Sequence, residues 1–523
     1  MEEEINTEVL IIGTGIAGCT AALELADAGI ETTLITRTEK LFESNSYYAQ
    51  GGIIYKGKGG EDSPDKLAAD ILTAGAGMSN KAAVDIISKE GPAMVEKILI
   101  NKVGVDFDKN DGELSRTKEG GQAVKRIIHR ADETGKAIEE ALVKEILRHP
   151  KIHILANVTA VDLLTPAHHS EDRMAIYEPL SCVGAYILDQ KTGKVDRCLA
   201  KQTILATGGL GQVYEFTTNP EGARGDGIAM ANRSGARTVN LEYIQFHPTT
   251  FYHSDAPRFL ITEAARGEGA RLVDFRGQPF MQKYDKRGDL ATRDIVSRSI
   301  YREMLATGAD NVYLDLRSYI SSEKIISRFP NIRETLLCYG IDILKDLVPV
   351  VPAAHYSCGG VYADARTGET TIRNLYAIGE VACTGLHGAN RLASTSLLEG
   401  LVWGGRAAGS IKERIKDPVS IFMKSIKPWQ TSDSKEVDPS LIAQDLKTIR
   451  GIMWNYVGLE RTAPRLVRAR IELGHAERSV EQFYQDGKIS DALLGLRNIA
   501  RTAVLIAEAA WENKQSAGCH YRI

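Results

Sequence analysis

The sequence lacks the features that would assign it to a membrane-spanning, metal-binding or nucleic-acid-binding class. No apolar run approaches the ~20 residues that span a bilayer, because charged residues or glycines interrupt each one. The seven cysteines include no C-x-x-C pair, so we expect free thiols in a reducing compartment and no metal site. There is no surplus of basic charge either: 64 basic and 68 acidic residues give a formal net charge of −4, which does not favour nucleic acid or anionic lipid as a partner.

The composition is that of a large globular protein. With 523 residues, 43% hydrophobic and 25% charged, the chain can form two or more cores and shows no bias towards disorder. Its first residues, MEEEINTEVLIIG, are acidic where a signal peptide is basic. We therefore expect a soluble, cytoplasmic, multidomain protein.

The N-terminal segment predicts a βαβ unit. A strand over Val9–Ile12 leads into a helix over Ile16–Ala28, and a second strand follows over Thr32–Thr36. The strand and the helix are joined by a G-x-G-x-x-G fingerprint, Gly13-Thr14-Gly15-Ile16-Ala17-Gly18. The first glycine makes the turn, the second lets a pyrophosphate approach the backbone, and the third lets helix and strand pack closely. The pattern predicts a dinucleotide site at the helix N-terminus.

Two later strand ends favour FAD as the dinucleotide. They are rich in small residues on which a long cofactor can lie, although each alone also fits an ordinary αβ turn: Ala206-Thr207-Gly208-Gly209 and Ala377-Ile378-Gly379-Glu380-Val381-Ala382. The acidic residue that binds the ribose of NAD is missing, because Ile35-Thr36-Arg37 ends the second strand. The ribose would then be bound by other atoms or by Glu39, and a nicotinamide cofactor is less favoured.

The order of the apolar segments predicts a mixed α/β fold with a discontinuous Rossmann-like FAD-binding domain. Further buried strands are expected at Ile152–Leu155, Thr203–Ala206 and Leu375–Ile378. Between them lies a section richer in Arg, Asp and aromatic residues, which we interpret as an inserted α+β capping domain. The expected division is an FAD-binding domain over 1–240 and 351–415, a capping domain over 241–350, a linker over 416–440 and a C-terminal helical bundle over 441–523.

Six sequence blocks make the chain similar to a known family. They are Ser46-Tyr47-Tyr48-Ala49-Gln50-Gly51-Gly52, Gln245-Phe246-His247-Pro248-Thr249, Thr262-Glu263-Ala264-Ala265-Arg266-Gly267-Glu268-Gly269, Arg293-Asp294-Ile295-Val296, His355-Tyr356-Ser357-Cys358-Gly359-Gly360 and His387-Gly388-Ala389-Asn390-Arg391-Leu392-Ala393-Ser394. In their residues and their order, the sequence resembles the fumarate reductase/succinate dehydrogenase flavoprotein family, and within it the L-aspartate oxidases.

The resemblance implies FAD that is held noncovalently. In succinate dehydrogenase-like relatives a histidine a few residues before the Ala-Gln-Gly-Gly block carries covalent flavin. Here Asn45 stands at that position, and an amide cannot form the bond. The resemblance implies that Asp226 binds the ribose. The alternative is that Asp226 caps a helix, which would give the same sequence pattern. Besides the fingerprint, the implied FAD contacts are Arg37, Asn45, Ser46, Tyr47, Tyr48, Ala49, Gln50, Gly51, Gly52, Ala160, Ala206, Thr207, Gly208, Asp226, Glu380, Asn390, Ser396 and Leu397.

The implied substrate is a small dicarboxylate. Desolvating its two carboxylates demands cationic or multiply hydrogen-bonding partners. The resemblance supplies Arg391, His355, His247, Thr262 and Gln245, of which Arg391 offers a bidentate fork. For a single histidine in a turn the alternative is a structural role.

The implied reaction pairs hydride transfer to the flavin with a proton transfer. The family's arginine relay maps onto Arg293, with Glu263 and Arg266 behind it. Arginine normally keeps its proton up to a pH of about 12. Arg293 is therefore either a base whose pKa is lowered by burial and positive neighbours or a group that only binds and polarises the substrate. A helix-end ion pair with Asp294 is a third interpretation.

Glu119 is expected to distinguish aspartate from succinate, because an anionic acceptor suits the extra ammonium group. It lies in a glycine loop, Lys118-Glu119-Gly120-Gly121, that matches a Glu-Gly-Gly block of the L-aspartate oxidases. The next residues are Gln122-Ala123 where many of these enzymes have His-Ser. The alternative is a solvated glutamate among Arg116, Lys118 and Lys125.

Three candidate functions follow, the third of a different class from the first two. The first is a soluble L-aspartate oxidase that makes iminoaspartate with O2 or fumarate as electron acceptor, in its family the first step of NAD biosynthesis via quinolinate, with hand-off to quinolinate synthase. The second is a fumarate reductase or succinate dehydrogenase flavoprotein, either soluble or docked to a membrane complex. The third is a non-catalytic flavoprotein that acts as a binding module. Asn45 and Glu119 favour the first over the second, and the set of charged site residues argues against the third.

Overall fold

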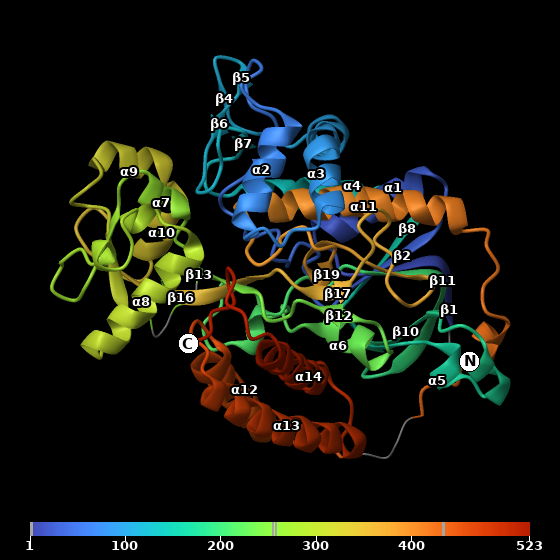
Figure 1. The fold of residues 1–523 in the computed structure, drawn as a ribbon. Coiled ribbons are helices and arrows are strands. Elements are labelled where there is room, and N and C mark those ends of the chain that lie inside the picture. The colour runs from blue at the N-terminus through green and yellow to red at the C-terminus, as the bar shows by residue number, and fades with distance from the viewer. Residues whose placement is uncertain (1–3, 254–255, 257–258, 431–434) are drawn as a thin grey trace.

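The chain folds around a central seven-stranded sheet that contains the predicted βαβ unit (Figure 1). The computed structural model describes residues 4–253, 256, 259–430 and 435–523; residues 1–3 of the acidic N-terminus and 431–434 of the predicted linker lie outside them. Strand β1 (Ile5–Ile12) pairs in parallel with β2 (Thr32–Thr36), and α1 (Ile16–Asp27) connects the two. The apolar run Val9–Ile12 is fully buried, which is why this strand lies in the middle of the sheet.

The remaining strands of the sheet come from distant parts of the chain. The order is β8–β2–β1–β11–β10–β9, with β18 beside β11. Their bounds are Ile152–Ala156 (β8), Val158–Leu163 (β9), Gly184–Asp189 (β10), Val195–Leu205 (β11) and Leu375–Ala377 (β18). Strands are present at all three predicted positions, and β11 starts earlier than its apolar run. The prediction that all three are buried was wrong for β8, an edge strand in which only Ile152 is buried. Since β1, β11 and β18 are parallel, their carboxyl ends meet at one edge of the sheet.

Helices cover one face of this sheet. The long α11 (Thr395–Arg414) lies along α1, and a Cβ at Gly404 would come within 2.8 Å of the Ala17 carbonyl oxygen, so glycine permits the close approach. Around this pair lie α2 (Pro64–Ala74), α3 (Lys81–Met94), which continues as a π-helix over Val95–Lys102, and α4 (Thr134–Ile146). Small sheets beside them contain β3 (Ile53–Ile54), β6 (Arg116–Thr117) and β7 (Ile127–Ile128), and β4 (Lys109–Asn110) with β5 (Glu113–Leu114).

A second sheet, antiparallel, stands at one side of the molecule (Figure 1). Its order is β13 (Ile244–Phe251), β16 (Val348–Ser357), β15 (Val312–Asp315) and β14 (Arg271–Val273). With it pack α7 (Glu263–Gly267), α8 (Arg293–Thr307), α9 (Ser322–Arg328) and α10 (Pro330–Leu337), around a core that includes Phe251, Phe280 and Phe329. Strand β16 runs through residue 351, and the division into domains stays a prediction.

The predicted C-terminal helical region is confirmed. It consists of α12 (Pro439–Val457), α13 (Ala463–Asp486) and α14 (Asp491–Glu512), which lie together below the central sheet in Figure 1. Helix α14 packs against α6 (Asp226–Arg233). The remaining elements are α5 (Pro166–His169) and a small sheet of β12 (Thr238–Val239), β17 (Gly360–Tyr362) and β19 (Ala382–Cys383). Within the described ranges, no helix has the length and apolarity needed to cross a membrane, and no cluster of His, Cys, Asp and Glu could hold a metal ion.

Candidate active site

A long pocket runs from the glycine turn after β1 to the N-termini of α7 and α8. It starts at the carboxyl edge of the parallel strands, where α/β folds place ligands. Its lining includes every predicted site residue except Gly18, Tyr47, Gln245, Arg266 and Asn390. Glu39, the alternative ribose contact, is exposed and outside the lining, so that alternative is not supported.

The glycine fingerprint has the geometry that the motif requires. Gly13 has φ +114°, and a Cβ there would lie 2.2 Å from the Ala206 carbonyl oxygen. A Cβ at Gly18 would lie 2.0 Å from the Gly13 carbonyl oxygen. Gly18 is therefore outside the lining because it lets helix α1 pack against the turn, which is the role predicted for the third glycine.

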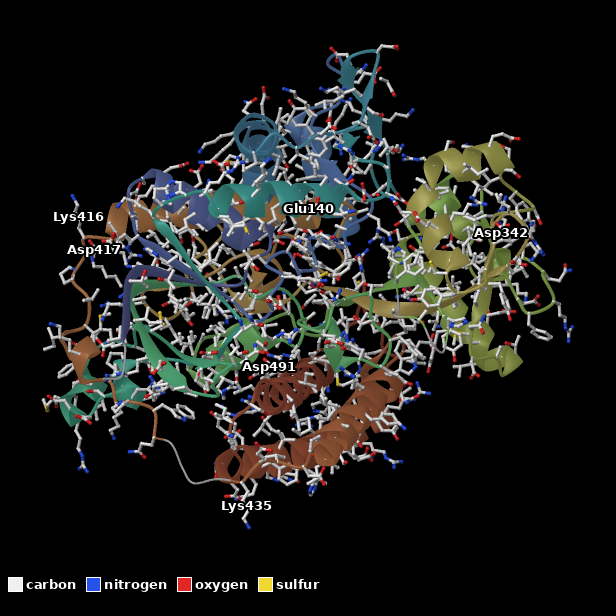
Figure 2. All side chains as sticks on the ribbon, turned by 180° about the vertical axis from the view of Figure 1, so that it is seen from behind. Glu140, Asp342, Lys416, Asp417, Lys435 and Asp491 are labelled. Carbon is white, nitrogen blue, oxygen red and sulfur yellow. The ribbon has the colours of Figure 1, made fainter. Side chains whose placement is uncertain are left out.

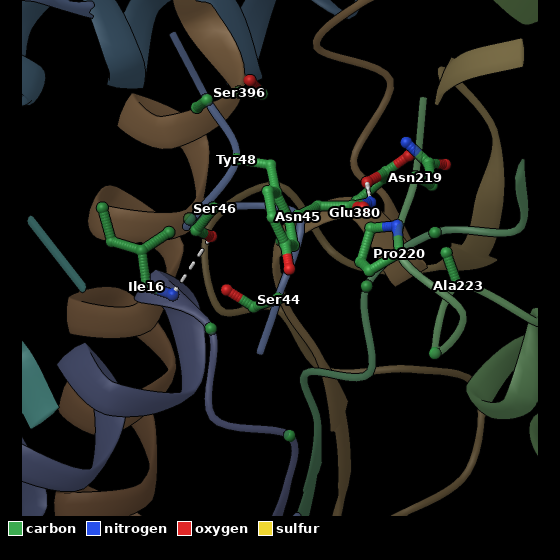
Figure 3. A pocket seen from close by; sticks show the side chains of 18 of the residues that line it. Ile16, Ser44, Asn45, Ser46, Tyr48, Asn219, Pro220, Ala223, Glu380 and Ser396 are labelled. Carbon is green, nitrogen blue, oxygen red and sulfur yellow. Dashed lines mark hydrogen bonds between the residues drawn. The ribbon is translucent and has the colours of Figure 1, made fainter. Parts of the chain in front are cut away.

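The pocket wall carries buried polar atoms that fit a long, polar cofactor. Asn45 Oδ1, Gln50 Oε1 and Thr207 Oγ1 are buried and have no hydrogen-bond partner within the described structure. Buried polar atoms are nearly always paired, so these three point to a bound group. Figure 3 shows Asn45 beside Glu380, whose Oε2 accepts a hydrogen bond from Asn45 Nδ2 at 2.8 Å. Burial raises the pKa of Glu380 to about 7.

A buried carboxyl group, Glu139, lies behind the wall of the pocket near the start of helix α1, and the sequence analysis missed this residue. The Ile16 amide donates to Ser46 Oγ at 3.3 Å (Figure 3). Behind this contact the hydroxyls of Ser46 and Ser44 approach Glu139 of helix α4, which is fully buried. Burial raises the pKa of Glu139 to about 8, and both carboxyl oxygens lack a hydrogen bond of good geometry among the described residues.

Helix α14 supports the opposite end of the pocket. Asp491, labelled in Figure 2 at the start of this helix, pairs with Arg37 at 3.3 Å and with Arg224 at 3.0 Å. Arg224 also pairs with Asp226 at 2.9 Å. Asp226 is the first residue of α6, whose N-cap is Gly225, so the interpretation of Asp226 as the cap itself was wrong. Arg224 and Asp491 belong to no local motif, and sequence reasoning therefore missed them.

Arg391 lies at the other end of the pocket with its guanidinium group held on three sides. It donates from Nε to Gln245 Oε1 at 3.2 Å, from Nη1 to Ser396 Oγ at 2.5 Å and from Nη2 to His355 Nε2 at 3.0 Å. Its cation lies 4.5 Å above the ring of Tyr356. Since an arginine has five N–H groups, one remains on each terminal nitrogen, which suits a carboxylate.

Two neutral histidines lie beside Arg391, with ring centroids 5.3 Å apart. Burial and the nearby arginines hold the pKa of both His247 and His355 well below the ordinary value. His355 Nε2 accepts from Arg391, so its proton lies on Nδ1, next to Thr218 Oγ1 at 2.8 Å. His247 Nδ1 accepts from the Thr249 amide, so Nε2 carries the proton. That Nε2 is buried without a partner in the described structure, and it is a donor facing the ligand space.

Arg293 and Glu263 form an ion pair where helices α7 and α8 begin. Arg293 Nε donates to Glu263 Oε2 at 2.6 Å, and Arg266 Nη2 lies 4.0 Å from Glu263 Oε1. Burial alone would raise the pKa of Glu263, but the guanidinium groups of Arg293 and Arg266 hold this pKa below its ordinary value. Asp294 pairs with Arg298, so the predicted alternative of an Arg293–Asp294 ion pair was wrong.

Gln245, Arg266 and Asn390 lie just behind the pocket wall. Gln245 Oε1 accepts from both Arg293 and Arg391, while its Nε2 donates to Asn390 Oδ1 at 2.7 Å. Asn390 Oδ1 also accepts from the thiol of Cys519 near the C-terminus, at 3.2 Å. Gln245, held by Asn390, therefore lies where it orients the two arginines from behind the pocket surface, whereas Arg266 donates to the Asp289 carbonyl oxygen at 2.6 Å.

Glu119 lines the pocket beside Arg293. Its Oε2 accepts a hydrogen bond from Ser394 Oγ at 2.6 Å. Burial raises the pKa of Glu119, although Arg293 and the Ser394 hydroxyl act in the opposite direction. The divergent Gln122 donates to the Ala393 carbonyl oxygen at 3.1 Å and so ties this loop to the start of helix α11. The alternative of a solvated loop glutamate was wrong.

Comparisons with known proteins agree with this geometry. Residues 8–397 match the family described as FAD binding domain. The L-aspartate oxidase of Yersinia pestis is 42% identical over 524 residues, covering 99% of this chain and 96% of that protein. L-aspartate oxidase 1 of Ralstonia nicotianae is 44% identical, covering 99% of this chain and 95% of that protein. Among solved structures, the FrdA chain of E. coli quinol fumarate reductase matches with a TM-score of 0.87 and 26% identity, covering 99% of this chain and 91% of the other.

Proposed function

Because this chain belongs to the L-aspartate oxidase family of flavoproteins and is an FAD-dependent oxidoreductase, we propose that it oxidises L-aspartate to iminoaspartate. The observation that carries the proposal is the arrangement of charge at the α7–α8 end of the pocket. Two arginines, Arg293 and Arg391, lie near two neutral histidines and two carboxylates, of which Glu263 is paired with Arg293 and Glu119 is the one we assign to the substrate amine. Two cations suit the two carboxylates of a dicarboxylate, and the anion suits the ammonium group of aspartate.

We assign FAD to the part of the pocket between the fingerprint and Asn45. The unpartnered atoms of Asn45, Gln50 and Thr207 are the groups that would hold it, together with the amides at the N-terminus of α1. When bound, FAD supplies a hydride acceptor for the substrate carbon that carries the amine. Asn45 offers no nucleophile, so we propose noncovalent binding.

The substrate carboxylates are bound by the arginine fork and the histidines. The two remaining N–H groups of Arg391 would bind one carboxylate in a bidentate manner. The Nε2–H of His247, together with the hydroxyl of Thr262, would bind the other. Because the histidines are neutral, they add hydrogen bonds without adding to the repulsion between Arg293 and Arg391.

Oxidation of the amine removes a hydride from the α-carbon and one proton from the ammonium group, and leaves a C=N bond. Of the two roles predicted for Arg293, we propose that it binds and polarises the substrate. Its Nε–H already donates a hydrogen bond to Glu263 Oε2 at 2.6 Å, and this ion pair favours the protonated guanidinium. We propose that Glu119 accepts a hydrogen bond from the ammonium group and takes up its proton. The raised pKa of Glu119 makes that carboxylate a better base than an exposed one.

The wider setting stays a proposal from the family resemblance. We propose O2 or fumarate as the electron acceptor, a cytoplasmic location, and hand-off of iminoaspartate to quinolinate synthase as the first step of NAD biosynthesis. A fumarate reductase or succinate dehydrogenase activity is the alternative. The observation behind this alternative is the likeness to the quinol fumarate reductase structure. Glu119 discriminates between the two, since a succinate site has no ammonium group to bind. A non-catalytic flavoprotein would have no use for the paired arginines.

The proposed selectivity is tested with Glu119→Gln. This variant should lose at least about tenfold in kcat/KM for L-aspartate, the effect of one charge-assisted hydrogen bond. Its affinity for succinate, titrated through the flavin absorbance, should stay the same or improve. Lys118→Gln is the matched control, because Lys118 is exposed in the same loop and donates to the Ala123 carbonyl oxygen. Equal losses for aspartate and succinate would contradict the amine role of Glu119.

A further inference from the structure

Helix α4 begins directly against the turn formed by residues 44–49. The Gly135 amide donates to the Ala49 carbonyl oxygen at 2.8 Å, and a Cβ at Gly135 would lie 1.9 Å from the Ser46 carbonyl oxygen, so only glycine permits this approach. On its other side the turn faces the pocket, and Ser44 and Ser46 are part of the pocket lining (Figure 3). The turn is therefore a thin wall between helix α4 and the space that we assign to FAD.

Glu139 lies one helical turn further along α4, behind this wall. It has no exposed surface and is not part of the pocket lining. The hydroxyls of Ser44 and Ser46 and the amide of Ile16 approach its carboxyl group. Ile16 is the first residue of α1, where helix amides would meet the pyrophosphate of FAD. Glu139 therefore faces, from behind, groups that FAD would meet from the pocket.

An ionised Glu139 would be an anion without a matching cation. No cation of the described residues is among the groups that shift its pKa, and burial raises this pKa to about 8. The titratable group that faces it from α1 is the thiol of Cys19, which donates to the Thr14 carbonyl oxygen at 3.0 Å and whose own pKa is raised by burial and by Glu139. The turn contributes two hydroxyls, and bound FAD would add the negative pyrophosphate. A buried, unpaired charge is costly, so the neutral acid is the form that suits this position.

The two serine hydroxyls already accept one hydrogen bond each. Ser46 Oγ accepts from the Ile16 amide at 3.3 Å, and Ser44 Oγ accepts from the Tyr47 amide at 3.2 Å. A hydroxyl can accept two hydrogen bonds and donate one. A neutral Glu139 can be the second donor to Ser46, and the serine proton is then left for an acceptor in the pocket. An ionised Glu139 only accepts, so it would draw that proton away from the pocket.

We propose that Glu139 is a positioning residue for FAD, which as a neutral carboxylic acid donates to the Ser46 hydroxyl and so directs the proton of that hydroxyl towards the pyrophosphate. Glu139 itself does not touch the cofactor. When it loses its proton, the pyrophosphate loses a donor and gains a negative charge beside it, so FAD binding weakens as pH rises. The inference rests on the proposed placement of FAD and not on the oxidation of aspartate.

The test is the Kd of FAD for the full-length chain freed of its cofactor, titrated through the flavin fluorescence between pH 7 and pH 9. In the unmodified protein this Kd should rise about tenfold, as expected for one group with a pKa of about 8 whose ionised form binds FAD poorly. Glu139→Gln cannot ionise and keeps an N–H donor, so its Kd should stay near the pH 7 value. Glu139→Leu has no donor, and its Kd should be about tenfold higher at pH 7 and equally independent of pH.

Glu140→Gln is the matched control. Glu140 is the next residue of α4 and is exposed (Figure 2), so this variant should keep the pH dependence of the unmodified protein. Glu380 also lines the pocket, and burial raises its pKa to about 7. It is present in every variant, so its contribution cancels when the variants are compared at the same pH.

Proton uptake is a second readout, which a role in packing alone would not change. At pH 8 about half of the FAD-free molecules carry an ionised Glu139, and FAD selects the neutral form. FAD binding should therefore take up about half a proton more in the unmodified protein than in Glu139→Gln. Calorimetric titrations in two buffers with different heats of ionisation measure this difference.

The outcomes are distinct. A rise in Kd that Glu139→Gln abolishes and Glu140→Gln keeps, together with the extra proton uptake, supports the inference. The same pH dependence in Glu139→Gln as in the unmodified protein would overturn it, and so would a Glu139→Leu protein that binds FAD normally at pH 7. If Glu139→Leu does not fold, the two glutamine variants still decide. Failure of the holoenzyme to oxidise L-aspartate would refute the proposed function alone, because FAD binding is measured without substrate.

Discussion

One prediction concerns Arg391, whose guanidinium group we propose as a ligand of a substrate carboxylate. Arg391→Leu keeps a side chain of moderate volume but removes the cation and the fork. A substrate carboxylate would then be desolvated without its partner, which costs about 2–5 kcal/mol. Gln245 Oε1 and His355 Nε2 would also lose their donor.

One effect acts in the opposite direction. Burial and the positive charge of Arg293 lower the pKa of Arg391, so removing Arg391 relieves some repulsion within the site. We therefore expect a value in the lower half of this range, about 3 kcal/mol, which weakens succinate binding roughly 150-fold.

The assay is a titration of the holoenzyme with succinate, followed by the flavin absorbance without oxygen. Arg406→Leu is the control, because Arg406 lies on the same helix α11, outside the pocket, and pairs with Glu90 at 2.6 Å. That variant should bind succinate normally. A normal Kd for Arg391→Leu with bound FAD would refute the assignment of Arg391 as the carboxylate ligand.

Three further predictions follow from the pocket. Heat or acid denaturation should release intact FAD into the supernatant, because Asn45 provides no nucleophile; flavin that precipitates with the polypeptide would contradict noncovalent binding. Arg293→Leu should abolish the loss of flavin absorbance on mixing with L-aspartate while FAD stays bound, and bleaching at the normal rate would remove Arg293 from the reaction. Glu139→Gln should stabilise the holoenzyme increasingly as pH rises from about 4.5 to about 8. Burial raises the pKa of Glu139 to about 8. Between these pH values the folded state therefore holds a proton that the unfolded state has already lost, and glutamine removes this cost. The gain is at most about 1.4 kcal/mol per pH unit, and melting temperatures at pH 5 and pH 8.5 test it; a difference that does not change with pH would count against a protonated Glu139.

The sequence predicted the parts of the site that depend on local chemistry. The fingerprint of Gly13, Gly15 and Gly18 requires only a strand, a turn and a helix, and these are adjacent in the chain. The strand ends at Thr207 and Glu380 were recognisable for the same reason, and both line the pocket.

The partners of these residues could not be predicted, because they meet only after folding. Asp491 pairs with Arg37 across 454 positions, and Ser394 reaches Glu119 across 275. The alternative of an Arg293–Asp294 ion pair was wrong for a geometric reason, since consecutive residues of a helix do not face each other. A family block also does not tell which of its residues face the ligand, which is why Gln245 and Asn390 turned out to lie behind the pocket wall.

The central claim, that this enzyme oxidises L-aspartate, is tested most directly by mixing the oxygen-free holoenzyme with L-aspartate or with succinate. The account predicts that L-aspartate bleaches the flavin absorbance and that hydrogen peroxide appears when air is admitted, while succinate binds with little or no bleaching. Bleaching by succinate and none by L-aspartate would contradict it and would make the chain a succinate-oxidising flavoprotein.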